Sequence, residues 1–104
     1  MAGNVSNCDA IITPPCIRAL YQFPEVPEYP NNVPRSDNSI GIYEGGDYYA
    51  QEDLDLFFTK FAPDIPNGTA PTPAFIDGAE APVAVNEAGG ESDLDFQLAY
   101  PISE

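Results

Sequence analysis

Proline most constrains what this chain can fold into, because twelve of its 104 residues are proline. A proline ring fixes the backbone φ angle and leaves no N–H to donate, so it interrupts helix interiors and central strands. Four prolines fall within residues 23–35 and predict an extended connector there. A second proline-rich loop is expected over residues 63–73. Regular structure is therefore expected only in the segments outside these two stretches.

Two of those segments carry strong local helix signals. Residues 13–21 open with Thr13, a suitable N-cap, followed by prolines in the first turn, where a missing N–H costs nothing. A second helix is expected over residues 51–61, ended by Pro63. Its apolar residues recur at i, i+3, i+4 and i+7 and predict a single stripe packed in a core: Leu54, Phe57, Phe58 and Phe61.

The remaining apolar segments suggest strands and one more helix. Residues 39–43, 74–77 and 82–85 are short and apolar, and each is expected to be a strand. A last helix is expected over residues 91–100, with Pro101 as its end. The order of strand, helix, two strands and helix, joined by long loops, predicts the opening part of an α/β domain.

The charge balance excludes several classes of partner. Three basic residues face seventeen acidic ones, for a formal net charge of −14. Nucleic acids and anionic membrane surfaces are bound by clustered Lys and Arg, so neither is an expected partner. No apolar run approaches the roughly 20 residues of a membrane span. The chain has no histidine, so any general base in it must be a carboxylate, which suits chemistry in acidic surroundings.

The signals of a secretory origin are mixed. Cys8 and Cys16 stand eight positions apart, which allows either a disulfide or two reduced, half-buried thiols. Asn4 and Asn67 each begin a triplet that can accept an N-linked glycan, although such triplets also arise by chance. Residues 1–7 lack the charged and apolar regions of a signal peptide and are expected to be a disordered N-terminus.

Glu91 and Asp95 form the candidate site. At i and i+4 on a helix, their Cβ atoms stand roughly 5–6 Å apart on one face. Two close carboxyl groups titrate together, and a proton shared between them can orient one as a base. The same spacing fits an ordinary solvated acidic face, or a calcium site in which Asp93 matters as much as Glu91. An EF-hand loop is excluded, because the sixth position counted from Glu91 is Phe96 instead of glycine.

Three motifs in a fixed order point to one family. Residues 12–21, ITPPCIRALY, match the pattern (I/V)TPxxIRxxY. Residues 40–43 precede a helix over residues 53–61 that matches DLxxFxxxF, and residues 88–97, AGGESDLDFQ, are similar to GxExxLDxQY. Together these stretches resemble the sedolisins, the serine-carboxyl peptidases, and most closely their tripeptidyl-peptidase branch. The first motif opens the catalytic domain in that family, and the last bears its two catalytic acids.

The resemblance implies a fold, a reaction and roles for two residues. The implied fold is the N-terminal portion of a subtilisin-like α/β domain with a parallel central sheet, which residues 8–104 would form in part. The implied reaction is acyl transfer by a serine, with Glu91 as its base and Asp95 as the acid that orients Glu91. Asp93 matches no catalytic position of the motif and is expected to contribute solvation or charge at a helix N-terminus.

The same resemblance implies that this chain is a fragment. The family's nucleophilic serine, its oxyanion-hole aspartate and its calcium site all lie farther downstream, so we expect no cofactor in this chain and no activity from it alone. The expected partners are the remainder of its own domain and a peptide or protein substrate, in an extracellular or acidic, vacuole-like compartment. The alternative is a stand-alone acidic binding or regulatory protein derived from a sedolisin.

Overall fold

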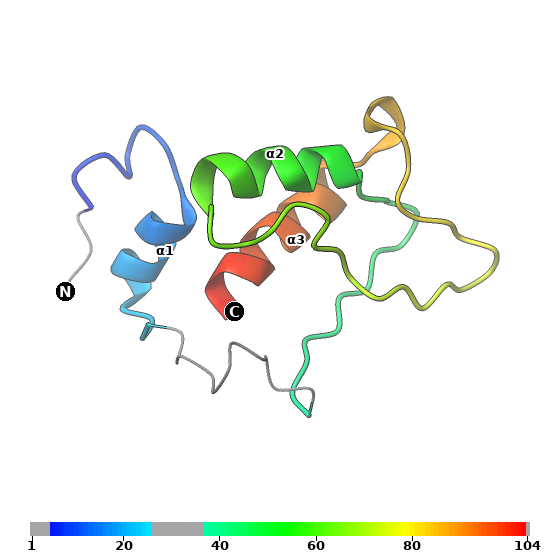
Figure 1. Ribbon diagram of the computed structural model, residues 1–104, viewed down its shortest axis with the longest axis horizontal. Helices are drawn as coiled ribbons and strands as arrows, with labels where there is room; N and C mark the ends of the chain where they lie inside the picture. Colours follow the sequence, from blue (N-terminus) through cyan, green and yellow to red (C-terminus); the bar gives the residue numbers. More distant parts are fainter. Residues whose placement is uncertain (1–4, 26–36, 104) are drawn as a thin grey trace.

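The computed structural model describes residues 5–25 and 37–103, and within them it contains helices and loops but no strand (Figure 1). The helices are α1 (Pro14–Tyr21), α2 (Gln51–Phe61) and α3 (Gly90–Ser103), with a short 3-10 helix, η2 (Val85–Glu87), before the last of them. Both α1 and α2 pack against α3, which is therefore the central element. None of these helices has the length and apolar character that crossing a membrane requires.

The two helices predicted from local signals are confirmed. Helix α1 begins where expected, and Oγ1 of its N-cap, Thr13, accepts a hydrogen bond from the backbone N–H of Cys16 at 3.3 Å. Helix α2 has the predicted bounds and carries Glu52 and Asp53 in its first turn. These acidic residues are stabilised by the positive end of the helix dipole.

The predicted α/β fold with a parallel sheet is wrong for the described residues. None of the segments 39–43, 74–77 and 82–85 is a strand there. A strand requires a neighbour whose N–H and C=O groups pair with its own, and no such ladder forms in this part of the chain. The apolar side chains of the first segment remain in solvent, with Ile40 65% and Tyr43 81% exposed.

The last helix is longer than predicted, because Pro101 lies inside α3 instead of ending it. Arg18 explains how the final turn is held. Its guanidinium donates to the carbonyl oxygens of Pro101 and Ile102, at 2.7 and 3.0 Å. These carbonyls belong to the helix end, where no further turn can supply donors. Arg18 thus ties α1 to the C-terminal end of α3, where a cation also complements the helix dipole.

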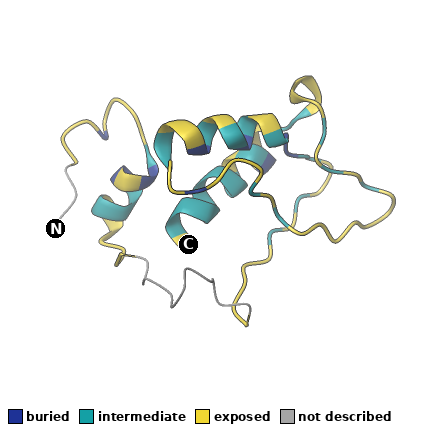
Figure 2. Cartoon of the chain, viewed as in Figure 1, coloured by how far each residue is buried: buried dark blue, intermediate teal, exposed yellow. Residues whose placement is uncertain are grey.

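A small core fills the space between α2 and α3 (Figure 2). Its buried apolar members are Tyr49, Leu54, Phe58 and Ile65. Aromatic rings of α3 complete it: Phe96 meets Tyr49 edge to face with ring centroids 5.2 Å apart, and Tyr100 meets Phe58 at 5.8 Å. The predicted apolar stripe of α2 is confirmed as core by Leu54 and Phe58, which are fully buried.

The other two members of the stripe are half-buried. Phe57 and Phe61 contact each other with ring centroids 5.0 Å apart, and Nζ of Lys60 lies 5.2 Å from the centre of the Phe61 ring. These side chains line one side of a shallow hollow of about 250 Å³ between α2 and Gln97 of α3. Two neighbouring faces of α2 are therefore apolar, and only one of them is fully covered.

Two aspartates join the N-terminal ends of α2 and α3. One lies in α3 and binds the start of α2, and the other lies before α2 and binds the start of α3. Oδ1 of Asp93, in α3, accepts from the backbone N–H of Ala50, the N-cap of α2, at 3.0 Å. Oδ2 of Asp47, in the segment before α2, accepts from the N–H of Ser92 in the first turn of α3, at 3.4 Å. We call these four residues the α2–α3 junction. Ser92 is 1% exposed, so the junction is closed to water on this side.

Gly89 is required beside the junction because there is no space for a side chain. A Cβ atom built on Gly89 would lie 1.1 Å from Oδ1 of Asp47, well inside atomic contact. The backbone N–H of Gly89 also donates to the carbonyl oxygen of Tyr48 at 2.8 Å, so the glycine cannot move away without losing a hydrogen bond. A side chain here would displace the carboxylate that binds the start of α3.

Three sequence predictions fall wholly or partly outside the described residues, and one of them is the possible glycosylation at Asn4. The connector expected over residues 23–35 includes residues 26–35, which are not described, and the disordered N-terminus expected over residues 1–7 includes residues 1–4, which are not described either. All three stay predictions, as does the domain boundary at residue 8.

We expect Gly89→Ala to lower the free energy of unfolding of the intact protein by about 1–3 kcal/mol, the usual cost of forcing extra atoms into a packed site. Urea unfolding followed by circular dichroism would measure it. Gly90→Ala is the matched control, since nothing lies within 4 Å of a Cβ at Gly90, the first residue of α3. The control should be neutral or slightly stabilising. Equal destabilisation by both substitutions would contradict the steric argument.

Candidate functional site

Glu91 and Asp95 lie at the N-terminal end of α3, on successive turns of the same face. Glu91 is the second residue of the helix and is exposed, whereas Asp95 is half-buried. The unpaired N–H groups of the first turn carry partial positive charge, which stabilises carboxylates placed there. The helix therefore brings the two acids together and offsets part of their mutual repulsion.

A third carboxyl group, that of Glu44, joins this pair from the loop before α2. Folding raises the pKa of Glu44, first because burial withdraws it from water and second because Asp95 hydrogen-bonds to its protonated form and repels its charged form. Asp47 and Glu91 add weaker repulsion in the same direction. Atom Oε1 of Glu44 is buried and has no hydrogen-bond donor among the described residues. We call Glu44, Glu91 and Asp95 the acidic group.

The acidic group can hold a proton that an isolated carboxylate would release. Two ionised carboxylates only accept hydrogen bonds, so Glu44 and Asp95 can bond to each other only when one of them is protonated. The raised pKa of Glu44 keeps that proton in place to a higher pH. Glu91 is the exposed member of the acidic group, so a group brought from solvent can reach its carboxylate.

Sequence reasoning did not select Glu44, because no local spacing links it to the helix that bears the pair. It directly follows the apolar segment 40–43 and approaches Asp95 only once the chain has turned at the α2–α3 junction. Its one signal was a lone acidic residue after an apolar run, which is too common to be specific.

Asp93 serves the α2–α3 junction. Burial raises the pKa of Asp93, the hydrogen bond from the N–H of Ala50 opposes that rise, and the neighbouring Asp53 and Asp47 add to it. Asp93 therefore lies in the first turn of its own helix, α3, and also accepts a hydrogen bond at the N-terminus of α2. The described residues contain no group of three or more acids or thiols that could hold a metal ion, which gives the calcium alternative no support here. The calcium site that the family resemblance implies stays a prediction.

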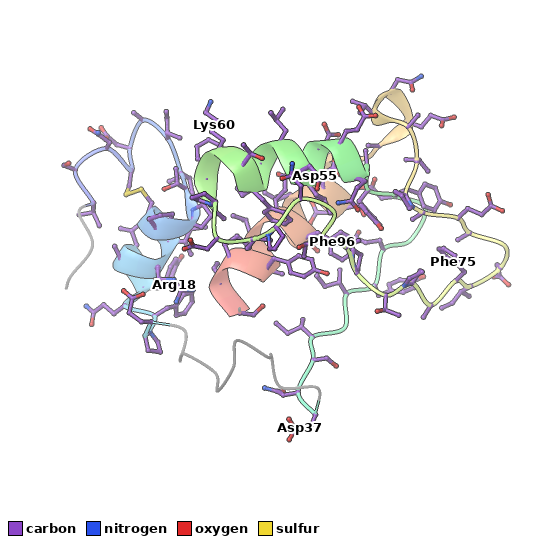
Figure 3. The ribbon with its side chains drawn as sticks, viewed as in Figure 1. Arg18, Asp37, Asp55, Lys60, Phe75 and Phe96 are labelled. Carbon is purple, nitrogen blue, oxygen red and sulfur yellow. A yellow bond between two sulfur atoms is a disulfide. The ribbon has the colours of Figure 1, made fainter. Side chains whose placement is uncertain are left out.

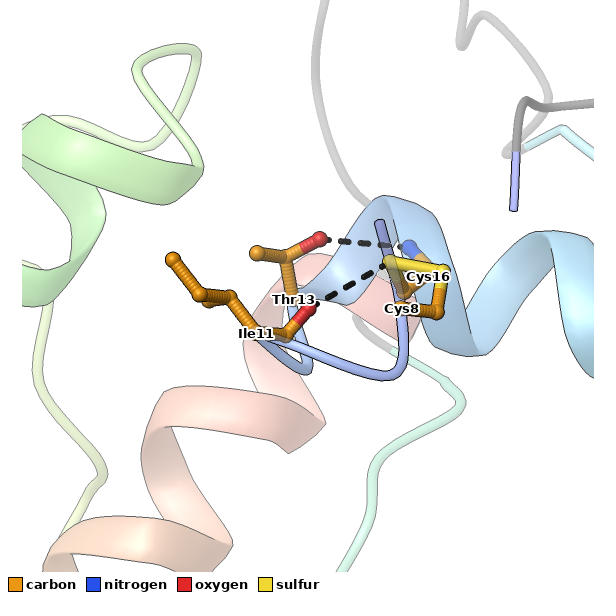
Figure 4. The surroundings of a disulfide bond; sticks show 4 residues. All are labelled: Cys8, Ile11, Thr13 and Cys16. Atoms are coloured by element: carbon orange, nitrogen blue, oxygen red, sulfur yellow. Dashed lines mark hydrogen bonds between the residues drawn. A yellow bond between two sulfur atoms is a disulfide. The ribbon is translucent and has the colours of Figure 1, made fainter. Parts of the chain in front are cut away.

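Cys8 and Cys16 are joined by a disulfide, with an S–S distance of 2.17 Å and Cα atoms 5.7 Å apart (Figure 4). The bond closes a short loop over the first turn of α1. The carbonyl oxygen of Ile11 lies 3.6 Å from Sγ of Cys16, on the inside of that loop. Disulfides of this kind persist in oxidising compartments, so the bond is compatible with an exported protein.

We expect Glu44→Gln to flatten the dependence of stability on pH. The pKa of Glu44 is raised above its ordinary value of 4.5 in the folded protein. The folded state therefore binds the proton more tightly, and the resulting stability is fully present below the ordinary pKa and is lost as pH rises through the raised pKa. Urea midpoints of the intact protein, measured between about pH 4 and pH 7, should fall less in the variant than in the wild type.

Glu80→Gln is the control for this prediction, because it removes the same charge from an exposed loop residue. The urea midpoint of this control should change with pH as steeply as that of the wild type. Some slope should persist in every variant, since the pKa of Asp93 is raised as well. A Glu44→Gln slope equal to that of the Glu80→Gln control would refute the role given to Glu44.

Comparison with curated proteins finds relatives along nearly the whole chain. The chain is 69% identical to aorsin of Aspergillus oryzae over 99 residues, which is 95% of this chain. It is 50% identical to the tripeptidyl-peptidase sed1 of Aspergillus fumigatus over 98% of the chain, and 40% identical to the tripeptidyl-peptidase SED1 of Arthroderma otae over 94% of it. The chain spans only 14–15% of the length of these relatives. No family model matches the chain, and no solved structure matches it significantly.

Proposed function

The chain belongs to the sedolisin family of peptidases and corresponds to a fragment of its longer members, and from this premise we propose that it supplies the base of a serine-type peptidase. In this proposal a serine outside the chain attacks the carbonyl carbon of a peptide bond. Glu91 accepts the serine proton, and Asp95 holds Glu91 in position. The substrate is a peptide or protein, and the enzyme is similar to the tripeptidyl-peptidases among its relatives.

The observation that carries this proposal is the placement of the acidic group. Glu91 is exposed at the start of α3, where an approaching hydroxyl group can reach it, and Asp95 is one turn behind. Glu44 interacts with Asp95 from the loop before α2. A serine hydroxyl is a weak nucleophile until a neighbouring base removes its proton. Because the chain has no histidine, a carboxylate is the base available in it.

A carboxylate base also accounts for a preference for acidic conditions, which we include in the proposal. A group transfers protons most efficiently when its pKa lies near the working pH. The pKa of Glu44 is raised by burial and by the neighbouring Asp95, so acidic conditions favour the protonated form of Glu44 that the folded protein prefers. The disulfide agrees with an enzyme that works outside the cell or in an acidic, vacuole-like compartment.

Exposed apolar side chains support the proposal that the partner of this segment is the remainder of the same peptidase. Tyr21, Tyr43 and Leu56 are 72%, 81% and 69% exposed, although each is large and apolar. They come from α1, the loop before α2, and α2, so uncovered apolar side chains occur in several parts of the described fold. In this proposal the remainder of the peptidase covers these side chains, as apolar surface in contact with another part of a protein is covered.

The mass of the intact native product separates this proposal from a stand-alone acidic binding or regulatory protein. We expect a product several-fold heavier than 11.2 kDa, because the relatives are much longer than this chain. Mass spectrometry of the protein recovered from its source would measure it. A native product near 11.2 kDa would favour the stand-alone alternative.

We expect Glu91→Gln in the full-length enzyme to lower kcat by about 100-fold to 10,000-fold, the usual contribution of a general base. An amide has no lone pair basic enough to accept the serine proton. Asp95→Asn should cause a smaller loss in kcat, because the base remains but is less well oriented. KM should change little in either variant, since neither residue is assigned to ground-state binding.

Cleavage of a peptide substrate at acidic pH, under steady-state conditions, would test both variants. Glu87→Gln is the matched control, because Glu87 is an exposed acid in η2, close in sequence to Glu91. It should retain wild-type kcat. A Glu91→Gln enzyme with wild-type kcat would overturn the assignment of the base.

A further inference from the structure

The loop after α2 contains a tight turn at residues 66–69, which includes the triplet Asn67-Gly68-Thr69. Both the backbone N–H and the hydroxyl group of Thr69 donate to the carbonyl oxygen of Pro66, at 3.2 and 2.7 Å. Gly68 has a φ of 86°, a value that side-chain-bearing residues rarely adopt. The sequence of the triplet is therefore also what gives the turn its shape.

The turn is fastened to one face of α2 by side chains of that helix. Oδ1 of Asp55 accepts from the N–H of Gly68 at 2.8 Å, and Nε2 of Gln51 donates to the carbonyl oxygen of Thr69 at 3.1 Å. The same Nε2 donates to Asp55 at 3.0 Å, which holds both side chains toward the turn. Figure 3 shows Asp55 on the underside of α2, toward α3 in this view.

Asn67 is exposed, and its two polar atoms differ in what they do. Atom Oδ1 accepts a hydrogen bond from the hydroxyl group of Thr59 on α2, at 3.1 Å. Atom Nδ2 makes no hydrogen bond to any described residue. A sugar attached at Nδ2 would replace one of its hydrogens and leave Oδ1 free to accept from Thr59. The folded turn can therefore carry a glycan without losing a contact.

We propose that Asn67 carries an N-linked oligosaccharide, and that the part of α2 around Thr59 consequently faces solvent in the whole peptidase. In the modification, Nδ2 bonds to C1 of the first sugar of a lipid-diphosphate-linked oligosaccharide. The C1–O bond to the diphosphate breaks, the lipid diphosphate leaves, and a proton of Nδ2 passes to a base of the transferring enzyme. A branched, hydrophilic glycan cannot be buried against protein, so no other part of the enzyme covers this turn.

Two independent observations place the chain where such a transfer occurs. It carries a disulfide, and disulfides form and persist in oxidising compartments such as the one in which N-glycans are added. Its relatives at 69% and 50% identity come from Aspergillus species, which are eukaryotes and possess that compartment. The glycan at Asn67 is inferred from these observations and the turn alone. The exposure of α2 around Thr59 in the whole peptidase rests also on the proposed function, which supplies the remainder of the peptidase.

Peptide mapping of the full-length protein, exported from a fungal host, tests the modification. Digestion with a peptide N-glycosidase in heavy-oxygen water should convert Asn67 into isotopically labelled Asp in most copies. Thr69→Ala and Asn67→Gln should abolish the label, and Thr69→Ser should keep it, since serine also completes the triplet. A glycoprotein exported by the same cells shows that the host is competent. Recovery of Asn67 unmodified from that host would overturn the proposal.

The solvent-facing side of α2 is tested on the native enzyme. An endoglycosidase should release the Asn67 glycan without denaturation, at the rate seen for the unfolded protein. Release only after denaturation would show that the turn is covered, and would overturn the proposal that α2 around Thr59 faces solvent. The Glu91→Gln variant should carry the same glycan as the wild type. A normal glycan on an enzyme whose Glu91→Gln variant stays active would defeat the proposed function and leave this inference standing.

Discussion

At the α2–α3 junction, the starts of α2 and α3 exchange hydrogen-bond acceptors. The positions of the core and of Glu91 follow from this contact. Asp93 reaches from α3 to the N-cap of α2, and Asp47 reaches from the segment before α2 to the first turn of α3. Each helix start leaves N–H groups without partners, and each is served by a carboxylate from elsewhere. Because the two helices are joined at the same end, the core forms between them, and Glu91 remains exposed to solvent.

The α2–α3 junction also brings some of the negative charge of this acidic chain to helix N-termini. Net repulsion at −14 opposes compaction. The two junction aspartates lie at helix N-termini, where backbone N–H groups and the helix dipole stabilise negative charge. Arg18, one of only three basic residues, binds the carbonyl oxygens at the opposite end of α3. The hydrogen bond from Ala50 offsets only part of the cost of burying the Asp93 carboxylate, whose pKa is raised in the folded protein.

The outcome of each prediction follows from the range of the interactions it relied on. The helices α1 and α2 were predicted well, because an N-cap such as Thr13 and a 3.6-residue apolar period act within a few residues. The strand expected over residues 39–43 was wrong, because a strand needs a distant partner and the described residues provide none. The end of α3 was misplaced because Arg18, far away in sequence, supplies donors to the turn that contains Pro101.

The same distinction between local and long-range interactions applies to the candidate site. The position of Glu91 and Asp95 on one face of a helix follows from the sequence alone, since a separation of four residues nearly completes a turn whatever surrounds it. The sequence alone also indicates which side chains of α2 could enter a core. Only the tertiary structure decided that Glu44 meets Asp95, that Asp93 serves α2 instead of the acid pair, and that Gly89 admits no side chain. Helical spacing is a local property of the backbone, whereas these contacts exist only after the α2–α3 junction has brought remote segments together.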